Sequence, residues 1–270
     1  MLRRTATVLF VLSALSLGAC VFGFRGEANV EASYPLTDID VVRIQLGPTP
    51  LTVLGDELAP GLELTGAWRS IGGTAQLAKD QALGSAIVWA VDQRFAELRA
   101  EVPLKLHGQV DFEVDEIRLP PDRDLELVTE LGDVYVFAVT GNISADVGVG
   151  HVDIDGGAGG LAVRTGDGNL HLRTSGNLDA YTGNGGAQIY QTGAGGNDLV
   201  IEARHGDVEV VLRSDADLDL RLSGREIRVH TGTVSSITRG SFTREVGGGS
   251  VKVWVDAPAG DISVSLDDTP

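Results

Sequence analysis

From Leu125 onward, apolar residues alternate with polar ones in short runs. A period of two predicts β-strands that present one apolar face. The runs include Val134 and Val136, Val152 and Ile154, Leu170 and Leu172, Val208 and Val210, and Ile262 and Val264. We therefore predict an all-β fold for this region, with the apolar faces turned toward a shared core.

Glycines separate the runs at a regular spacing. When every second glycine is counted, the interval is eighteen residues, except for one interval of twenty between Gly186 and Gly206. The series is Gly132, Gly150, Gly168, Gly186, Gly206, Gly224 and, twice eighteen further on, Gly260. A fixed period with two strands and two turns per repeat is typical of a solenoid, because one repeat alone cannot bury its apolar stripe. We expect a flattened two-sheet β-solenoid with regular repeats over residues 125–266. A β-sandwich of hairpins is the alternative, since the same turn residues suit hairpins.

The first half of the chain is less regular. Residues 74–83 form the one segment with helical spacing, and Thr74 stands at the N-cap position. Residues 20–37 contain Gly, Glu, Asn, Ser and Pro without a sustained period, which indicates a tether. The β-repeat domain would then cover residues 38–266, followed by a short tail over 267–270.

The first twenty residues have the pattern of an export signal. Arg3 and Arg4 form a basic start, and a mostly apolar stretch too short to span a bilayer follows. With the small residues that come next, this pattern predicts a signal peptide over residues 1–19. Residues 17–20 read Leu-Gly-Ala-Cys, which resembles the lipobox of bacterial lipoproteins. The resemblance implies cleavage before Cys20 and its lipidation; the alternative is a buried free cysteine near the end of an ordinary signal.

Composition narrows the possible partners. The chain has 38 acidic and 21 basic residues, a net charge of −17, and Cys20 is its only cysteine. Such a charge argues against nucleic acid, whose phosphates would be repelled, and against a polybasic grip on a membrane. The single cysteine leaves no intrachain disulfide and fits the lipidation position. Membrane attachment would therefore come from the lipid on Cys20.

Several recurring strings resemble a known family. Gly-Asp followed by Val or Ile opens strands at residues 132, 206 and 260, Leu119 precedes Pro120, and residues 247–250 read Gly-Gly-Gly-Ser. These features are similar to the bacterial putative-adhesin β-strand repeat family over residues 38–266, most clearly from Leu119 onward. The resemblance implies an exported or membrane-anchored protein, and it brings no catalytic residues with it.

One stretch looks like a metal site. Residues 193–201 read GAGGNDLVI and match most fixed places of the calcium-binding nonapeptide, with Asp198 in the ligand position. The nonapeptide binds calcium in tandem, and the nearest other candidate has Leu161 where the Asp should stand. We therefore interpret residues 193–198 as an enlarged turn before a strand. Asp198 remains a candidate cation ligand.

A second group of carboxylates lies further on. Asp215, Asp217 and Asp219 would share one face of a strand, flanked by Arg213 and Arg221. Successive side chains on one face are roughly 6.6 Å apart. That spacing is too wide for three carboxylates to share one calcium with ligand distances of about 2.4 Å. A solvated charge ladder is the simpler interpretation, and the three residues are kept only as candidate cation ligands.

Nothing in the sequence predicts catalysis. No zinc-protease, nucleophile-elbow or phosphate-loop motif occurs, and in the eighteen-residue register His151 aligns with Asn169 and His171 with Asp153. No column of histidines forms. We therefore predict that the protein is not an enzyme and has no cofactor.

The predicted function is that of a lipid-anchored protein of the bacterial cell envelope. An acidic solenoid surface would serve adhesion, binding or scaffolding toward an unknown envelope protein or surface ligand. In a Gram-negative host, Val21 after the cysteine favours the outer membrane. Two alternatives remain. One is a sensor or regulatory lipoprotein that binds another envelope protein, and the other is a carbohydrate-binding or polysaccharide-cleaving β-solenoid.

Overall fold

The computed structural model describes residues 24–107, 109–193, 197–213, 217–231, 234–246 and 248–267. This part of the chain is nearly all β, as predicted, and contains one α-helix. It divides after Gly132 into two compact units, unit 1 and unit 2, which are described separately. Within the described ranges, no helix is long and apolar enough to cross a membrane.

Unit 1 begins with a strand and contains the helix. Its elements are β1 (Phe24–Pro35), β2 (Val41–Gln45), β3 (Leu51–Gly55), β4 (Gly61–Gly72), α1 (Ala75–Leu83), β5 (Ala86–Asp92), β6 (Phe95–Glu101), the 3₁₀ turn η1 (Leu104–Leu106), β7 (Val110–Leu119) and β8 (Asp124–Leu131). One ladder pairs β1 with β4, β4 with β7, and β7 with β3. A second ladder pairs β5 with β6, β6 with β2, and β2 with β8. The rings of Tyr34 on β1 and Trp89 on β5 stack at 4.8 Å, so side chains of the two ladders meet in the core.

The expected tether over residues 20–37 is wrong for most of its length. Residues 24–35 form β1, which pairs with all twelve residues of β4. Gly26, Val30 and Tyr34 are buried, the alanines between them are half-buried, and the polar residues that alternate with them are exposed. This is a period of two, but most of its inward positions hold Gly or Ala, so the composition resembles that of a linker.

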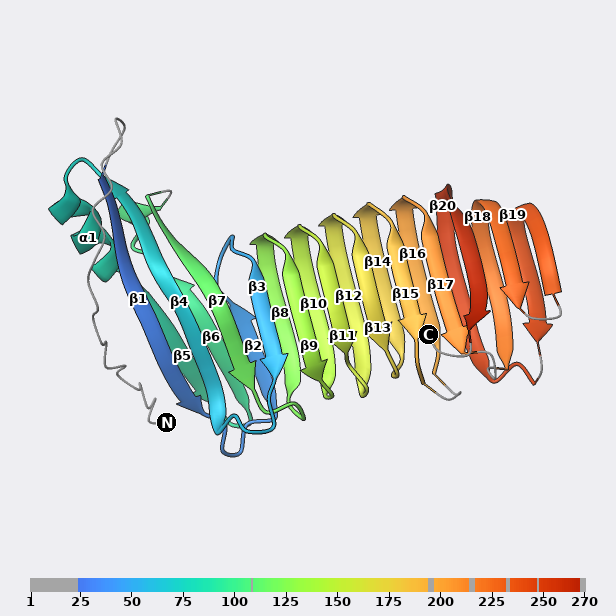
Figure 1. Cartoon of the computed structure of the whole chain (residues 1–270), viewed down its shortest axis with the longest axis horizontal. Coiled ribbons are helices and arrows are strands. Elements are labelled where there is room, and N and C mark those ends of the chain that lie inside the picture. Colours follow the sequence, from blue (N-terminus) through green and yellow to red (C-terminus); the bar gives the residue numbers. More distant parts are fainter. Residues whose placement is uncertain are drawn as a thin grey trace. The chain divides into compact units, whose positions relative to one another are not determined.

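The predicted helix is confirmed as α1. The Thr74 hydroxyl accepts a hydrogen bond from the Leu77 amide at 3.1 Å, which caps the first turn. Ala78 and Ala82 are fully buried. A side-chain carbon on Gly26 of β1 or Gly72 of β4 would collide with the Ala78 backbone, so α1 lies directly against these two strands. Figure 1 shows the helix beside the start of β1.

Unit 2 consists of short strands followed by three long ones. The strands are β9 (Val134–Val139), β10 (Asn142–Val149), β11 (Val152–Gly156), β12 (Gly160–Asp167), β13 (Leu170–Thr174), β14 (Leu178–Asn184), β15 (Ala187–Gln191), β16 (Leu199–His205), β17 (Val208–Arg213), β18 (Leu218–Thr231), β19 (Val234–Val246) and β20 (Val251–Asp267). Consecutive strands from β9 to β17 alternate between two parallel ladders. The first ladder contains β10, β12, β14 and β16, and the second contains β9, β11, β13, β15 and β17.

The register within the ladders follows the predicted period only in part. Val134 pairs with Val152 and Val152 with Leu170, eighteen residues apart each time. The next step, from Leu170 to Ala187, is seventeen residues, and the step from Ala187 to Val208 is twenty-one. Parallel pairing over these strands rules out the alternative of successive hairpins here.

A column of glycines runs along one edge of unit 2. A side-chain carbon on Gly168 would collide with the carbonyl oxygen of Gly150, and Gly185 stands in the same relation to Gly168. Gly206 and Gly260 continue the column. The member after Gly168 is therefore Gly185 and not the predicted Gly186. Gly224, which was also predicted, lies in the middle of β18.

The C-terminal strand is inserted out of sequence order. β20 pairs in parallel with β16 through Val253, with β17 through Ile262, and with β18 along most of its length. It therefore lies between the earlier strands and the antiparallel pair of β18 and β19, as Figure 1 shows. Because β18, β19 and β20 run through both ladders, they join them into one sheet. The expectation of two separate sheets is met only in part.

Candidate functional site

The predicted site residues do not gather at one place. Cys20 and Asp215 lie outside the described residues. Asp198 immediately precedes β16, Asp217 immediately precedes β18, and Asp219 lies within β18. The expectation of one strand carrying Arg213 to Arg221 is wrong, because β17 ends at Arg213 and β18 begins at Leu218.

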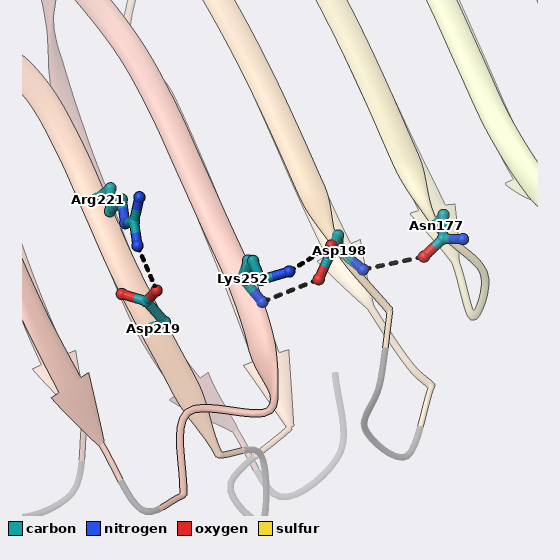
Figure 2. Close-up of polar contacts among 5 residues, drawn as sticks. All are labelled: Asn177, Asp198, Asp219, Arg221 and Lys252. Atoms are coloured by element: carbon teal, nitrogen blue, oxygen red, sulfur yellow. Dashed lines mark hydrogen bonds and ion pairs between the residues drawn. The ribbon is translucent and has the colours of Figure 1, made fainter.

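Asp198 is tied to the strands on either side of it (Figure 2). Its amide donates to Oδ1 of Asn177 at 2.9 Å, and its own Oδ1 accepts from the Lys252 amide at 3.2 Å. The Lys252 ammonium lies 3.5 Å from the other carboxylate oxygen. Asn177 and Asp198 immediately precede β14 and β16, and Lys252 is the second residue of β20, so Asp198 bridges neighbouring strands. This carboxylate has a structural role that the nonapeptide comparison did not suggest.

Asp219 and Asp217, the other candidate cation ligands among the described residues, have different surroundings. Asp219 accepts from Arg221 at 3.0 Å, and in the strand register it lies opposite Lys252 (Figure 2). The side chain of Asp217 is exposed, and its carbonyl accepts from the Val251 amide at 2.8 Å. Within the described ranges, no three His, Cys, Asp or Glu side chains are placed to hold a metal ion. The geometry therefore points to charge pairing at these positions.

A recurrent set of side-chain to backbone bonds links one strand start to the next in unit 2. Oδ1 of Asp133 accepts from the His151 amide at 2.8 Å, and Nδ1 of His151 accepts from the Asn169 amide at 3.1 Å. Oδ1 of Asn169 then accepts from the Gly186 amide at 2.8 Å. Asp207 makes the same bond to Asp261, also at 2.8 Å. We call this set the turn ladder; it consists of Asp133, His151, Asn169, Asp207 and Asp261.

In the sequence these positions stand out only because each directly follows one of the spaced glycines. Asp and Asn are common at such turns because their side chains bond to nearby backbone groups. The additional signal was the residue type itself: each member that accepts such a bond has its acceptor atom, Oδ1 or Nδ1, two bonds beyond Cβ. The first three members are eighteen residues apart. That combination predicts an acceptor placed over the next repeat's amide.

Exposed side chains form rows across the parallel strands because the register is maintained. One row of the second ladder contains Asp153, His171, Gln188 and Glu209. His171 Nδ1 lies 3.0 Å from Asp153 Oδ1, and Gln188 donates to Glu209 at 3.2 Å. The predicted alignment of His171 with Asp153 is confirmed. The row is a surface of paired polar groups.

The first ladder carries a comparable row on its outward face. Asp146, Arg164, Tyr181 and Glu202 succeed one another across β10, β12, β14 and β16. The Arg204 guanidinium lies 5.5 Å from the centre of the Tyr181 ring. Tyr190 belongs to the other ladder, where His171 meets it edge-on at 5.5 Å. Tyr181 and Tyr190 are therefore on different ladders and do not form one aromatic platform.

Shifted pKa values trace structural contacts. Hydrogen bonding to Arg225, whose Nε lies 2.8 Å from Oδ1, lowers the pKa of Asp261 in the turn ladder. Partial burial, helped by the neighbouring Asp133 carboxylate, raises the pKa of Tyr135. Burial raises the pKa of Tyr34 in unit 1 to about 12. Asp261 and Tyr135 lie on separate strands of unit 2, β20 and β9, and Tyr34 belongs to the core of unit 1.

The chain was compared with known proteins. No protein-family model matches it, and no curated protein matches its sequence. Several solved structures are similar to it. A putative cell adhesion protein from Clostridium sporogenes is 13% identical, with a TM-score of 0.37, over 89% of this chain and 100% of that one. A putative adhesin from Bacteroides fragilis is 13% identical, with a TM-score of 0.39, over 87% and 96%. A putative adhesin from Parabacteroides merdae is 9% identical, with a TM-score of 0.34, over 88% and 96%. At these values the similarity assigns a role to no residue of this chain.

Proposed function

We propose that this chain is a non-enzymatic binding protein of the bacterial envelope, anchored by a lipid on Cys20. The observation that carries the binding role is the alignment of exposed polar side chains into rows across parallel strands. Buried rows of Val, Leu and Ile beneath them fix the spacing. Such a surface offers a ligand many weak, regularly placed polar contacts without requiring a pocket.

We further propose that β9 to β17 are coils of a flattened two-sheet solenoid. The support is the alternation of consecutive strands between two parallel ladders and the initial step of eighteen residues. In this arrangement each coil contributes one strand to each sheet, and the glycine column marks one corner. The later steps of seventeen and twenty-one residues adjust the turns and keep the strands aligned.

The partner is proposed to be an envelope protein or a surface ligand that recognises the acidic rows. Residues 24–213 contain 29 acidic and 13 basic residues, so a complementary partner would be basic. Charge complementarity sets the rate and selectivity of such association more than its final affinity. Binding should therefore weaken as salt is raised.

Charge reversal on the first ladder tests the proposed binding surface. Asp146 and Glu202 are exposed on β10 and β16 in the row of the first ladder, and Asp146→Lys with Glu202→Lys should reduce copurification of partner from detergent-solubilised membranes. Glu57→Lys, an exposed change in a loop of unit 1, is the matched control and should leave copurification intact. Equal copurification with the parent, the double variant and the control would reject this surface.

The anchor is tested separately. Cys20→Ser should abolish incorporation of labelled fatty acid and release the chain from the membrane fraction. Protease added to intact cells would then show whether the anchored protein faces outward. Persistent fatty-acid labelling of the serine variant would reject Cys20 as the lipidation site.

A further inference from the structure

The strand β1 begins very close to the proposed lipid. Only residues 21–23 separate Cys20 from Phe24, the first residue of β1. An extended chain spans at most about 3.5 Å per residue, so the two Cα atoms are within about 14 Å of each other. An acylated Cys20 would therefore hold the start of β1 near the bilayer surface. The long tether expected from composition would have imposed no such limit.

The start of β1 belongs to a distinct end of unit 1. Phe24 pairs with Gly72 at the end of β4, and Ser70 pairs with Val110 at the start of β7. Ala86, which opens β5, pairs with Glu101, which closes β6. The connections through α1 and through η1 therefore lie at this same end, as the position of α1 in Figure 1 illustrates. We call residues 24–26, 71–84 and 102–107 the helical end.

The helical end exposes large apolar side chains. Of the eight exposed large apolar residues in the described part of unit 1, five belong to it: Phe24, Ile71, Leu77, Leu83 and Leu104. Leu104 is 86% exposed and Ile71 is 57% exposed. On α1 the small residues Ala78 and Ala82 are buried while the larger Leu77 and Leu83 face outward. A concentration of exposed apolar side chains marks an interaction surface.

The charge of the helical end also differs from the rest of unit 1. It contains three basic residues, Arg25, Lys79 and Lys105, and one acidic residue, Asp80. The remainder of residues 24–132 contains six basic and eighteen acidic residues. Basic side chains next to exposed apolar ones match the boundary between lipid headgroups and acyl chains. The acidic remainder would be repelled from an anionic membrane surface.

We infer that the helical end is a membrane-contacting surface whose apolar side chains enter the lipid boundary beside the anchor. This inference rests on the proposed lipidation of Cys20, since the short link brings this end to the bilayer. The contact fixes which end of unit 1 faces the membrane. The lipid provides attachment, and the helical end provides orientation.

The lysines of the chain provide an internal measurement. There are three: Lys79 and Lys105 at the helical end, and Lys252 in unit 2. The chain from Cys20 onward is coupled through its single thiol to a maleimide lipid in phosphatidylethanolamine–phosphatidylglycerol vesicles, so the measurement does not depend on lipidation in cells. Amine acetylation is followed by mass spectrometry with and without vesicles. Lys79 and Lys105 should react several-fold more slowly on vesicles, and Lys252 should be unchanged. Equal rates at all three lysines would overturn the inference.

Two variants test whether apolar contact with the lipid, and not another cause, slows the acetylation of Lys79 and Lys105. Leu77→Asp with Leu104→Asp should restore fast acetylation of Lys79 and Lys105 on vesicles. Leu58→Asp is the matched control and should retain protection, because Leu58 is 89% exposed and precedes β4 at its far end, where Gly61 pairs with Pro35. All three positions are exposed, so unchanged melting temperatures are expected and verify folding. Protection that persists in the double variant would count against apolar insertion.

A longer link distinguishes attraction from mere closeness. About twenty Gly and Ser residues inserted between residues 23 and 24 would let unit 1 move tens of ångströms from the lipid. Protection of Lys79 and Lys105 should survive this insertion, and its loss would reject an attractive contact. The anchor and the contact can also fail separately. Absence of fatty acid on Cys20 in cells would reject the anchor alone, whereas unprotected lysines on coupled vesicles would reject the contact alone.

Discussion

The carbonyl oxygen of Gly150 occupies the space that a side chain on Gly168 would need. Gly168 also has φ of +155°, outside the range that residues with a side chain readily adopt. Gly168→Ala should therefore lower the free energy of unfolding by about 3 kcal/mol or more. The new methyl group would clash with the main chain of Gly150, which can move only if the paired strands also shift. Urea unfolding followed by circular dichroism measures the change.

Gly73→Ala is the control for this substitution. Gly73 precedes the helix N-cap and has no positive φ, and a side-chain carbon added to it would meet no atom within 4 Å. Its effect should stay within about 0.5 kcal/mol. Similar losses for the two variants would show that the glycine column has no special packing role.

Asn169 tests the turn ladder. Asn169→Ala removes the acceptor for the Gly186 amide and should cost about 1 kcal/mol, a typical value for one hydrogen bond. Asn169→Asp keeps an oxygen at the same place and should retain most of the stability. If the alanine and aspartate variants melt at the same temperature, the bond is not what stabilises this turn.

Removal of one complete coil tests the proposed solenoid. Deletion of residues 152–169 removes β11 and β12, so that β13 and β14 can take their positions against β9 and β10. The shortened protein should still unfold cooperatively, at a lower temperature, because stability in stacked repeats is roughly additive. Deletion of residues 152–160 alone would shift every later strand to the opposite ladder, and no cooperative transition is expected. Equal tolerance of both deletions would contradict the solenoid.

The buried hydroxyl of Tyr34 should make the folded protein less stable in alkali. Its hydroxyl is buried and has no hydrogen-bond partner among the described residues, and burial raises its pKa to about 12. The unfolded chain releases this proton at about pH 10, so the contribution is complete below pH 10 and declines between pH 10 and 12. Two pKa units correspond to a loss of about 3 kcal/mol.

Tyr34→Phe should remove that part of the pH dependence. At neutral pH the variant should be as stable as the parent, because no hydrogen bond is lost and the ring can still stack on Trp89. Thermal melts from pH 8 to 12 would show two curves that diverge only above pH 10. Parallel curves would assign the alkaline loss to other groups.

Asp198 provides a test of the calcium interpretation. Its carboxylate already bridges to the Lys252 amide and ammonium, so millimolar calcium should leave the melting temperature nearly unchanged. Asp198→Asn should be mild, because an amide oxygen can accept from the Lys252 amide. Asp198→Ala should cost about 1 kcal/mol. A large calcium-dependent rise in melting temperature would restore the metal-site interpretation.

The sequence was most informative where a local pattern of residue types determines the element. Alternating Val, Leu and Ile predicted the strands of unit 2, and Thr74 predicted the start of α1. It was misleading where small residues carry the alternation: from Phe24 to Pro35 most inward positions hold Gly or Ala, so the segment resembles a tether in composition. Its partner β4 lies more than 25 residues further on, so no local signal shows the pairing.

The candidate site shows the same division. Spacing aligned His171 with Asp153, and the strand register confirms this. Asp198 immediately precedes β16, as predicted, but residues 194–196 of the predicted turn lie outside the described residues. Spacing could not show that Lys252, 54 residues away, would meet Asp198, because that contact depends on the inserted position of β20. The break between β17 and β18 was also invisible, since charged residues continue across it.

The inserted position of β20 constrains the order in which the molecule can assemble. A chain emerging from its N-terminus presents β18 and β19 before β20 exists, and the hairpin they form has no direct pairing to β16 or β17 among the described strands. The hairpin can dock only after the last strand is present. The final step of folding is then the pairing of strands that are far apart in sequence, and such a step is slow. Until then β16 and β17 present unpaired edges, which are open to mispairing. A chain that is cut before Val251 therefore lacks the strand that joins β18 and β19 to β16 and β17, and its sheet stays incomplete.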